Sequence, residues 1–136
     1  HGGSRYGMTA SAVVPVSMEP PSLLVCVNRT ASSYEALLAA GAFTVNFLSA
    51  DNAALCEAFS RVRNGEQRLG NGRWEDGTDG LPYLADAQSA IGCSLVQRVE
   101  HGTHDVLVGT VREVRRRTGV APLLWVDGGL AAVAGR

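Results

Sequence analysis

The sequence predicts a mainly β, antiparallel fold that closes into a barrel, with two or so helices at its periphery. About six segments have the apolar runs or the period-two alternation of strands, whereas only two have helical spacing. One predicted strand is apolar on a single face and its neighbour is apolar on both, which is typical of a barrel or sandwich wall. A tight connection at residues 101–103 predicts that these two strands form a hairpin. A closed antiparallel barrel is therefore favoured over a doubly wound sheet.

The N-terminal part of the chain contains two predicted strands. Gly2 and Gly3 permit a positive φ, so we expect a turn there, followed at once by a strand. That strand runs into a proline turn at residues 20–21. The next strand is predicted over residues 22–27, because this short apolar run is bounded by the prolines and by Asn28.

A hydroxyl-rich turn precedes the first predicted helix. Ser32 and Glu35 fit an S-x-x-E capping box, so the helix is expected to begin near Ser32 or Ser33. The first amide groups of a helix lack internal partners and carry partial positive charge, which favours an anion beside them. Thr30 adds a hydroxyl donor and Arg29 adds a full charge. The pattern therefore predicts a phosphate site at this turn.

The rest of the chain alternates between clear elements and one irregular stretch. Residues 42–48 predict a strand and residues 51–59 predict the second helix. Residues 60–80 are rich in glycine and charge and show no period, so a long structureless loop is expected, either a mobile insertion or a lid. Further strands are expected over residues 89–99, 105–114 and 122–126.

Composition indicates one ordinary globular domain. The 136 residues are 46% hydrophobic and 18% charged with a net charge of -1, so no nucleic-acid footprint is indicated. No run approaches the ~18 apolar residues of a membrane helix and no signal-peptide pattern opens the sequence, so a cytoplasmic location is expected. Cys26, Cys56 and Cys93 have no metal-binding spacing, and we expect packed thiols with no disulfide and no metal.

Four separated blocks resemble the flavin reductase-like family and occur in the family's order: GMTASA, PPSLLVCVNRTASS, AFTVNFLSAD and GTHDVLVGTV. The resemblance covers nearly the whole chain. It implies an FMN-binding split β-barrel of Greek-key type that binds FMN or FAD and reduces it with NADH or NADPH. Members often release the reduced flavin to a partner monooxygenase. They normally carry a helix and a strand before this point, so a preceding segment is expected.

The resemblance also implies which residues contact the flavin. The block Thr9, Ala10 and Ser11 would lie along the isoalloxazine ring; the alternative is a strand whose small residues allow barrel closure. Phe59 fits core packing as well as flavin contact, because an aromatic residue at helical spacing most often packs. The phosphate and ribityl contacts carry over to Asn28, Arg29, Thr30 and Ser33, and more loosely to Phe59, Ser60 and Arg61.

His104 matches a family histidine that holds the nicotinamide nucleotide, which makes it the candidate catalytic residue as well. The alternative is a solvent-facing hairpin histidine. No glycine fingerprint of the Rossmann or P-loop type is present, so the nucleotide would lie directly against the flavin. Trp125 matches a nucleotide-binding aromatic of the final strand. Asp127 and Gly128 stand where the family commonly has a basic residue, which favours NADH over NADPH.

The expected function is therefore that of an NAD(P)H:flavin oxidoreductase serving a monooxygenase. A flavin-binding electron carrier or oxidase without nucleotide turnover, and a flavin-free binding module, remain as alternatives. A homodimer is expected, because split barrels of this family cover the open edge of the flavin with a second subunit, through an isologous interface. The apolar run at residues 130–133 is a candidate contributor.

Overall fold

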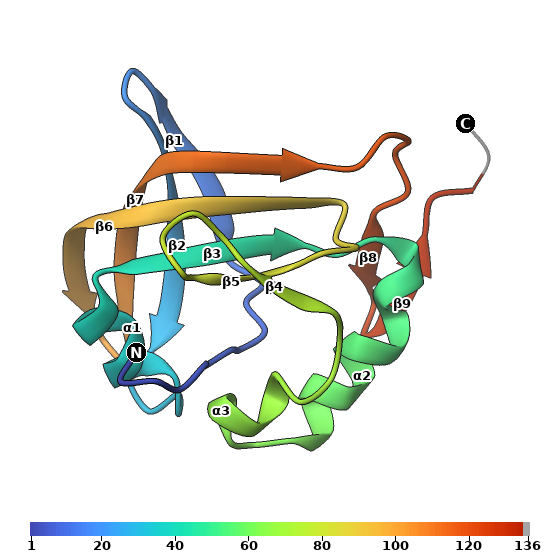
Figure 1. The fold of residues 1–136 in the computed structure, drawn as a ribbon, viewed down its shortest axis with the longest axis horizontal. Helices are drawn as coiled ribbons and strands as arrows, with labels where there is room; N and C mark the ends of the chain where they lie inside the picture. Colours follow the sequence, from blue (N-terminus) through green and yellow to red (C-terminus); the bar gives the residue numbers. More distant parts are fainter. Residues whose placement is uncertain (135–136) are drawn as a thin grey trace.

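The computed structural model describes residues 1–134, apart from the side chains of residues 65 and 66. Its main sheet is antiparallel, with the strand order β1-β2-β7-β6-β3 (Figure 1). The order β2-β7-β6-β3 is that of a Greek key. These strands are β1 (Val13–Met18), β2 (Pro21–Asn28), β3 (Ala42–Phe47), β6 (Ser89–His101) and β7 (His104–Arg116). The predicted mainly β, antiparallel class is confirmed, and β1 and β3 stand at the two ends of this strand order.

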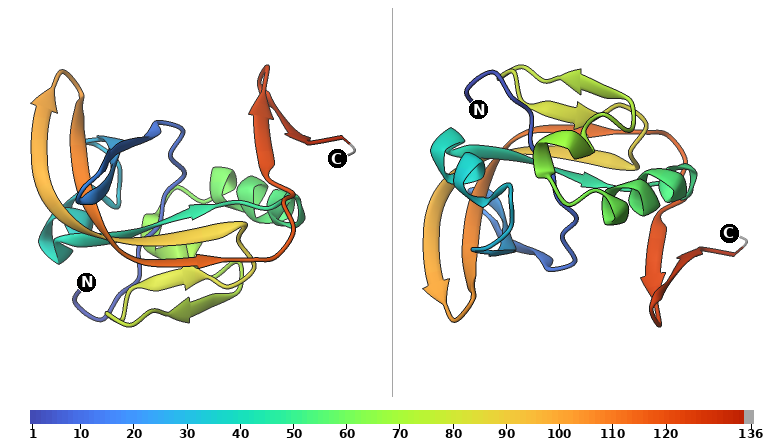
Figure 2. Two further views of the ribbon diagram at one scale, coloured as in Figure 1. Left: turned by 90° about the horizontal axis from the view of Figure 1, so that it is seen from above. Right: turned by 90° about the horizontal axis from the view of Figure 1, so that it is seen from below.

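The helices and two small hairpins surround this sheet. The helices are α1 (Tyr34–Ala40), the 3-10 turn η1 (Ala50–Asn52), α2 (Ala53–Arg61) and α3 (Gly65–Arg68). The hairpins are β4 (Trp74–Asp76) with β5 (Pro82–Leu84), and β8 (Leu123–Val126) with β9 (Gly129–Ala132). The β8–β9 hairpin projects from one end of the molecule (Figure 2). Over the described residues, no helix is long and apolar enough to cross a membrane.

The hydrophobic core is formed by residues of β2, β3, β6 and β7 together with α1. Alternate residues of β2 point into it, which is the period-two pattern that the sequence predicts for this strand. Cys93 has no exposed surface, and its burial raises the pKa of the thiol to about 11, so it packs as a small apolar residue. The buried members are Leu23, Val25, Val27, Tyr34, Phe43, Cys93 and Leu107.

The prediction of a structureless loop over residues 60–80 is wrong. Both α3 and β4 lie within it, and tertiary contacts hold it in place. The Trp74 ring stacks on Phe59 with centroids 6.1 Å apart. Arg68 donates from Nε to the Val62 carbonyl at 2.6 Å. These elements could not be predicted from the glycine-rich, charged sequence, because contacts between distant residues stabilise them rather than a local periodicity.

The expected start of the first strand is also wrong. Gly2 and Gly3 do form a turn at positive φ, but β1 begins only at Val13. Residues 4–12 run as irregular chain along the body. Thr9, Ala10 and Ser11 therefore do not belong to a barrel strand, and the alternative explanation of their small side chains fails.

Two irregularities interrupt the pairing of β6 with β7. The register shifts once where Arg112 of β7 has no opposite residue and again where Val96 of β6 has none. The alternation of β6 holds across the first shift, because Ile91, Cys93 and Leu95 all pack in the hydrophobic core.

The strand predicted over residues 122–126 is confirmed as β8, whereas its partner β9 was not predicted. The signal was present: Asp127-Gly128 is a turn dipeptide that favours a two-residue hairpin. In the structure both residues have positive φ, 47° and 77°, and Val126 pairs with Gly129.

The close approach of β7 to the core supplies a stability test. A Cβ atom at Gly109 would lie 2.6 Å from Phe43 Cζ and 2.8 Å from Cys93 Cβ. We therefore expect Gly109→Ala to lower the free energy of unfolding by ~1–3 kcal/mol through overpacking. The matched control is Gly92→Ala, whose Cβ would meet nothing nearer than 3.6 Å. Urea unfolding of both variants checks this; equal stability of the two would contradict it.

Candidate functional site

Gly7 lies where two of the four resembling blocks, residues 7–12 and 20–33, meet the end of α2. The Gly7 carbonyl accepts a hydrogen bond from Ser33 Oγ at 3.0 Å and one from Arg68 Nη1 at 3.3 Å. A Cβ atom at Gly7 would lie 2.5 Å from Leu69 Cδ1 and 3.3 Å from Phe59 Cε2. Glycine leaves room for both side chains, and the N-terminal segment lies between the helix start at residue 34 and the end of α2.

The strip of Thr9, Ala10 and Ser11 follows this junction. All three residues are exposed. The structure records no hydrogen bond between them and any other described residue. Their side chains are small, so the strip presents bare backbone N–H and C=O groups that a flat polar ligand can approach.

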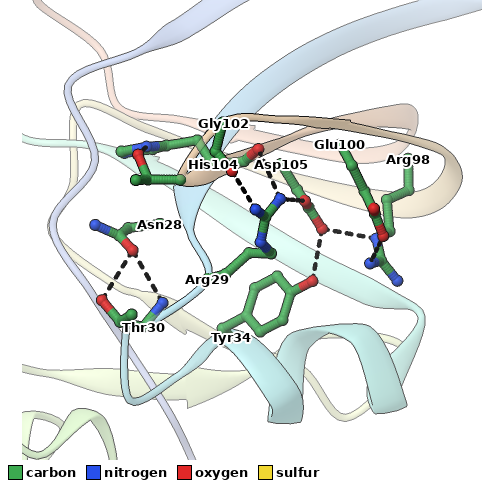
Figure 3. Close-up of polar contacts among 10 residues, drawn as sticks. Asn28, Arg29, Thr30, Tyr34, Arg98, Glu100, Gly102, His104 and Asp105 are labelled. Atoms are coloured by element: carbon green, nitrogen blue, oxygen red, sulfur yellow. Dashed lines mark hydrogen bonds and ion pairs between the residues drawn. The ribbon is translucent and has the colours of Figure 1, made fainter.

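The turn at Asn28 and Thr30 is closed by its own side chains. Asn28 Oδ1 accepts from the Thr30 amide at 2.9 Å and from the Thr30 hydroxyl at 2.8 Å (Figure 3). This Asx-type turn orients the chain that leads into α1. Thr30 is exposed, whereas Ser33 is buried.

The predicted capping box is wrong. Ser33 rather than Ser32 is the residue before the helix, and it makes no side-chain capping bond. The Ser32 hydroxyl instead donates to the Arg63 carbonyl at 3.1 Å. The two serines thus fasten the turn to residues 7 and 63. Because α1 has only seven residues, its dipole adds little to an anion site.

The three candidate residues at the end of α2 differ in their exposure and in their hydrogen bonds. Phe59 is only 7% exposed and packs on Trp74 and Gly7, as its core-packing alternative requires. Ser60 donates from its hydroxyl to the Glu57 carbonyl at 2.6 Å. The Arg61 guanidinium lies 3.5 Å from the Glu57 carboxylate and remains 77% exposed, so it can still meet a ligand.

A buried carboxylate that the sequence did not single out lies behind the turn. Asp105 has no exposed surface. It accepts from the Tyr34 hydroxyl and from Arg98 Nε, both at 2.6 Å, and from Arg29 Nη1 at 3.1 Å (Figure 3). Glu100 pairs with Arg98 on the exposed side. The one available signal was an aspartate inside an apolar strand, directly after His104.

The partners of Asp105 keep it ionised. The hydrogen bond from Tyr34, followed by those from Arg29 and Arg98, holds the pKa of this carboxyl below its ordinary value of 3.8, against the opposing effect of burial. The same bond raises the pKa of the Tyr34 phenol, which therefore stays a neutral donor.

His104 lies at the tip of the β6–β7 hairpin, opposite His101 in the register. Its Nδ1 contacts the Thr103 hydroxyl at 2.8 Å, and its side chain is exposed. Asn28 pairs with His104 across β2 and β7, so the structure places this histidine beside the candidate phosphate turn.

Trp125 lies elsewhere. It is 67% exposed and belongs to the β8–β9 hairpin. That hairpin and the β6–β7 turn stand at opposite ends of the molecule in both views of Figure 2. One chain by itself therefore does not bring Trp125 to His104.

The depressed pKa of Asp105 predicts a pH dependence of stability. A carboxyl whose pKa is lowered on folding stabilises the protein above its unfolded pKa, and this contribution is lost as the pH falls through the folded pKa. Between pH 5 and 2, Asp105→Asn should therefore show a flatter fall of Tm than the unsubstituted protein, although its Tm at pH 7 is lower. Scanning calorimetry across this range measures both.

Glu113 gives an internal comparison for that experiment. Hydrogen bonds from Thr78 and Arg115 lower its pKa as well. Glu113 and Asp105 lie at opposite ends of β7, so the effects of Glu113→Gln and Asp105→Asn on the slope should add. An unchanged slope in Asp105→Asn would contradict the assignment.

Comparisons with known proteins agree with the resemblance. The FMN reductase (NADH) RutF of Pseudomonas syringae pv. syringae is 39% identical over 123 residues, 90% of this chain and 69% of that protein. The reductase component of the FADH(2)-dependent resorcinol hydroxylase of Rhizobium sp. is 43% identical over 120 residues, 88% of this chain and 67% of that protein.

Solved structures share the fold. The NADH:FAD oxidoreductase SgcE6 of Streptomyces globisporus matches with a TM-score of 0.90 at 28% identity, over 98% of this chain and 81% of that one. BorF, the flavin reductase component of a bacterial two-component tryptophan halogenase, matches with a TM-score of 0.89 at 27% identity, over 100% of this chain and 87% of that one. The sequence model of the flavin reductase like domain matches residues 1–134. The chain therefore belongs to the flavin reductase-like family.

Proposed function

We propose that this chain is a flavin reductase that uses NADH to reduce FMN or FAD and supplies the reduced flavin to a partner monooxygenase. The observation that carries the proposal is its similarity to an FMN reductase (NADH) and to the reductase component of a hydroxylase, over 90% and 88% of this chain. A cytoplasmic location belongs to the proposal, because NADH is drawn from the cytoplasmic pool.

The residues around Gly7 fit a flavin. The backbone groups of Thr9, Ala10 and Ser11 would pair with the donors and acceptors along the edge of the isoalloxazine ring, and their small side chains would let the ring approach. The Asn28–Thr30 turn and the exposed guanidinium of Arg61 would lie beside the ribityl phosphate. The bound flavin would supply the hydride-accepting chemistry.

The role of this chain is then to position its ligands. Backbone amides of residues 10 and 11 would stabilise negative charge that develops on the ring. The contact of His104 Nδ1 with Thr103 leaves Nε2 as the nitrogen that meets the nicotinamide nucleotide. His104 stands at the end of β2, next to the turn that would hold the flavin phosphate.

One assay tests the proposal. The purified chain is mixed with NADH and either FMN or FAD, and NADH oxidation is followed by absorbance. Turnover with either flavin supports the proposal. Flavin binding without NADH oxidation would favour an electron carrier or oxidase, and absence of flavin binding would favour a flavin-free module.

A substitution at His104 tests its role. We expect His104→Ala to reduce kcat/KM for NADH ~10- to 100-fold, which is ~1.4–2.7 kcal/mol of transition-state stabilisation, with flavin affinity nearly unchanged. His101→Ala is the matched control, because His101 is an exposed histidine on the facing strand of the same hairpin. Stopped-flow reduction of bound flavin measures the effect. An unchanged rate in His104→Ala would show that His104 is a solvent-facing hairpin residue without a role in nucleotide binding.

A homodimer is also part of the proposal. Leu124, Trp125 and Val126 expose apolar side chains on the projecting β8–β9 hairpin, and the run at residues 130–133 forms the other strand of that hairpin. Because this hairpin stands at the opposite end of the molecule from the β6–β7 turn, where β7 begins with His104, Trp125 would serve the nucleotide site of a second copy. A two-fold axis makes both contacts at once.

Sedimentation equilibrium at micromolar concentration tests the dimer. The unsubstituted chain should sediment as two chains, and Trp125→Glu should raise the dimer dissociation constant at least ~30-fold, as for a buried aromatic anchor. Met18→Glu is the control, since Met18 is 89% exposed at the β1–β2 turn. A single-chain mass for the unsubstituted protein would rule the dimer out.

A further inference from the structure

The side chain of Arg29 does not extend from the turn toward solvent. Its Nη1 lies 3.1 Å from Asp105 Oδ1 and 3.4 Å from the His104 carbonyl, and its Nη2 donates to the Gly102 carbonyl (Figure 3). Its backbone amide donates to the Thr103 carbonyl at 3.1 Å. Residue 29 thus contacts four consecutive residues of the β6–β7 hairpin.

The charge of Arg29 is already matched. Asp105 is fully buried and takes hydrogen bonds from Arg29, Arg98 and Tyr34. Glu100 neutralises Arg98 on the exposed side, so the negative charge of Asp105 is left to neutralise Arg29. Turning Arg29 outward would leave the buried Asp105 short of a donor and would remove the side-chain donor of the Gly102 and His104 carbonyls. The loss at the buried carboxylate is the costly one.

We propose that Arg29 is a positioning residue which, with Asp105, clamps the hairpin turn of residues 102–104 onto the end of β2, and that it does not bind the flavin phosphate. The forked guanidinium is required because it reaches a carboxylate and a carbonyl together. Through these contacts the turn after β2, which would lie beside the flavin phosphate, also fixes the position of His104. The inference rests on the proposed function only through the role given to His104.

Hydrogen exchange in the flavin-free protein tests the clamp. Arg29→Met and Arg29→Lys should both exchange at least ~10-fold faster over residues 100–105, with no change in β3, because neither side chain can make the forked contact. Arg5→Met is the matched control, since Arg5 is similarly exposed (44% against 36%) and, within the described part of the chain, pairs only with Asp76. Exchange at the unsubstituted rate in Arg29→Met would overturn the proposal. The test uses Arg29 variants because they keep the buried Asp105 in place, whereas Asp105→Asn could prevent folding.

Affinities for FMN and riboflavin separate the two roles of Arg29. A positioning residue leaves the ratio of the two affinities within about threefold of the unsubstituted value in Arg29→Met. A direct phosphate contact lowers that ratio ~10- to 150-fold, and Arg29→Lys, which keeps the charge, restores it. That second pattern would overturn the proposal.

Turnover adds a readout tied to His104. Arg29→Met should lower kcat/KM for NADH about tenfold, and the double variant with His104→Ala should be no slower than His104→Ala alone, because both changes remove the same contact. Losses that simply multiply would overturn the link to His104. If the unsubstituted chain oxidises no NADH, the proposed function fails, while the exchange and affinity measurements still judge the clamp.

Discussion

The geometry of the candidate site depends on one buried charge. An ionised carboxylate without exposed surface is tolerated only where donors replace the water it has lost. Asp105 finds three donors, and they come from the turn after β2, from the first residue of α1 and from β6. Through these bonds the turn after β2, the helix start and the hairpin tip are held to one another.

A second constraint acts at Gly7, where irregular chain rather than a strand enters the site. The Gly7 carbonyl is held by Ser33 and Arg68, and the missing side chain makes room for Phe59 and Leu69. The hydroxyl of Ser33 and the guanidinium of Arg29 are both engaged within the protein. The Thr30 amide and hydroxyl both donate to Asn28, and the amides of residues 29 and 31 donate within the protein as well. Among the residues that the resemblance assigns to the flavin phosphate, the cation left for an anion is therefore the exposed Arg61.

The sequence predicted those elements that local pattern specifies. The apolar run before Asn28 and the hairpin at Gly102 are examples, because periodicity and a tight turn act within a few residues. Asp127-Gly128 carried an equally local signal for β9. The small helix and strand after Val62 could not be predicted, since the Phe59–Trp74 stack and the contacts of Arg68 form only once the chain is folded.

For the site, the sequence predicted which residues take part, but it did not predict which groups their side chains contact. The resemblance marked Arg29 and His104, and both lie at the junction of β2 and β7. Nothing in the local pattern indicated that Arg29 faces an aspartate 76 positions away, or that Tyr34 faces the same aspartate 71 positions away. An arginine beside a turn that resembles a phosphate site is predicted to bind the phosphate when the carboxylate that it pairs with cannot be identified from the sequence. The buried carboxylate reverses that assignment, because an arginine that hydrogen-bonds to it is already neutralised. Of the two arginines that the resemblance assigns to the flavin phosphate, the exposed Arg61 is then the one left to meet an anion.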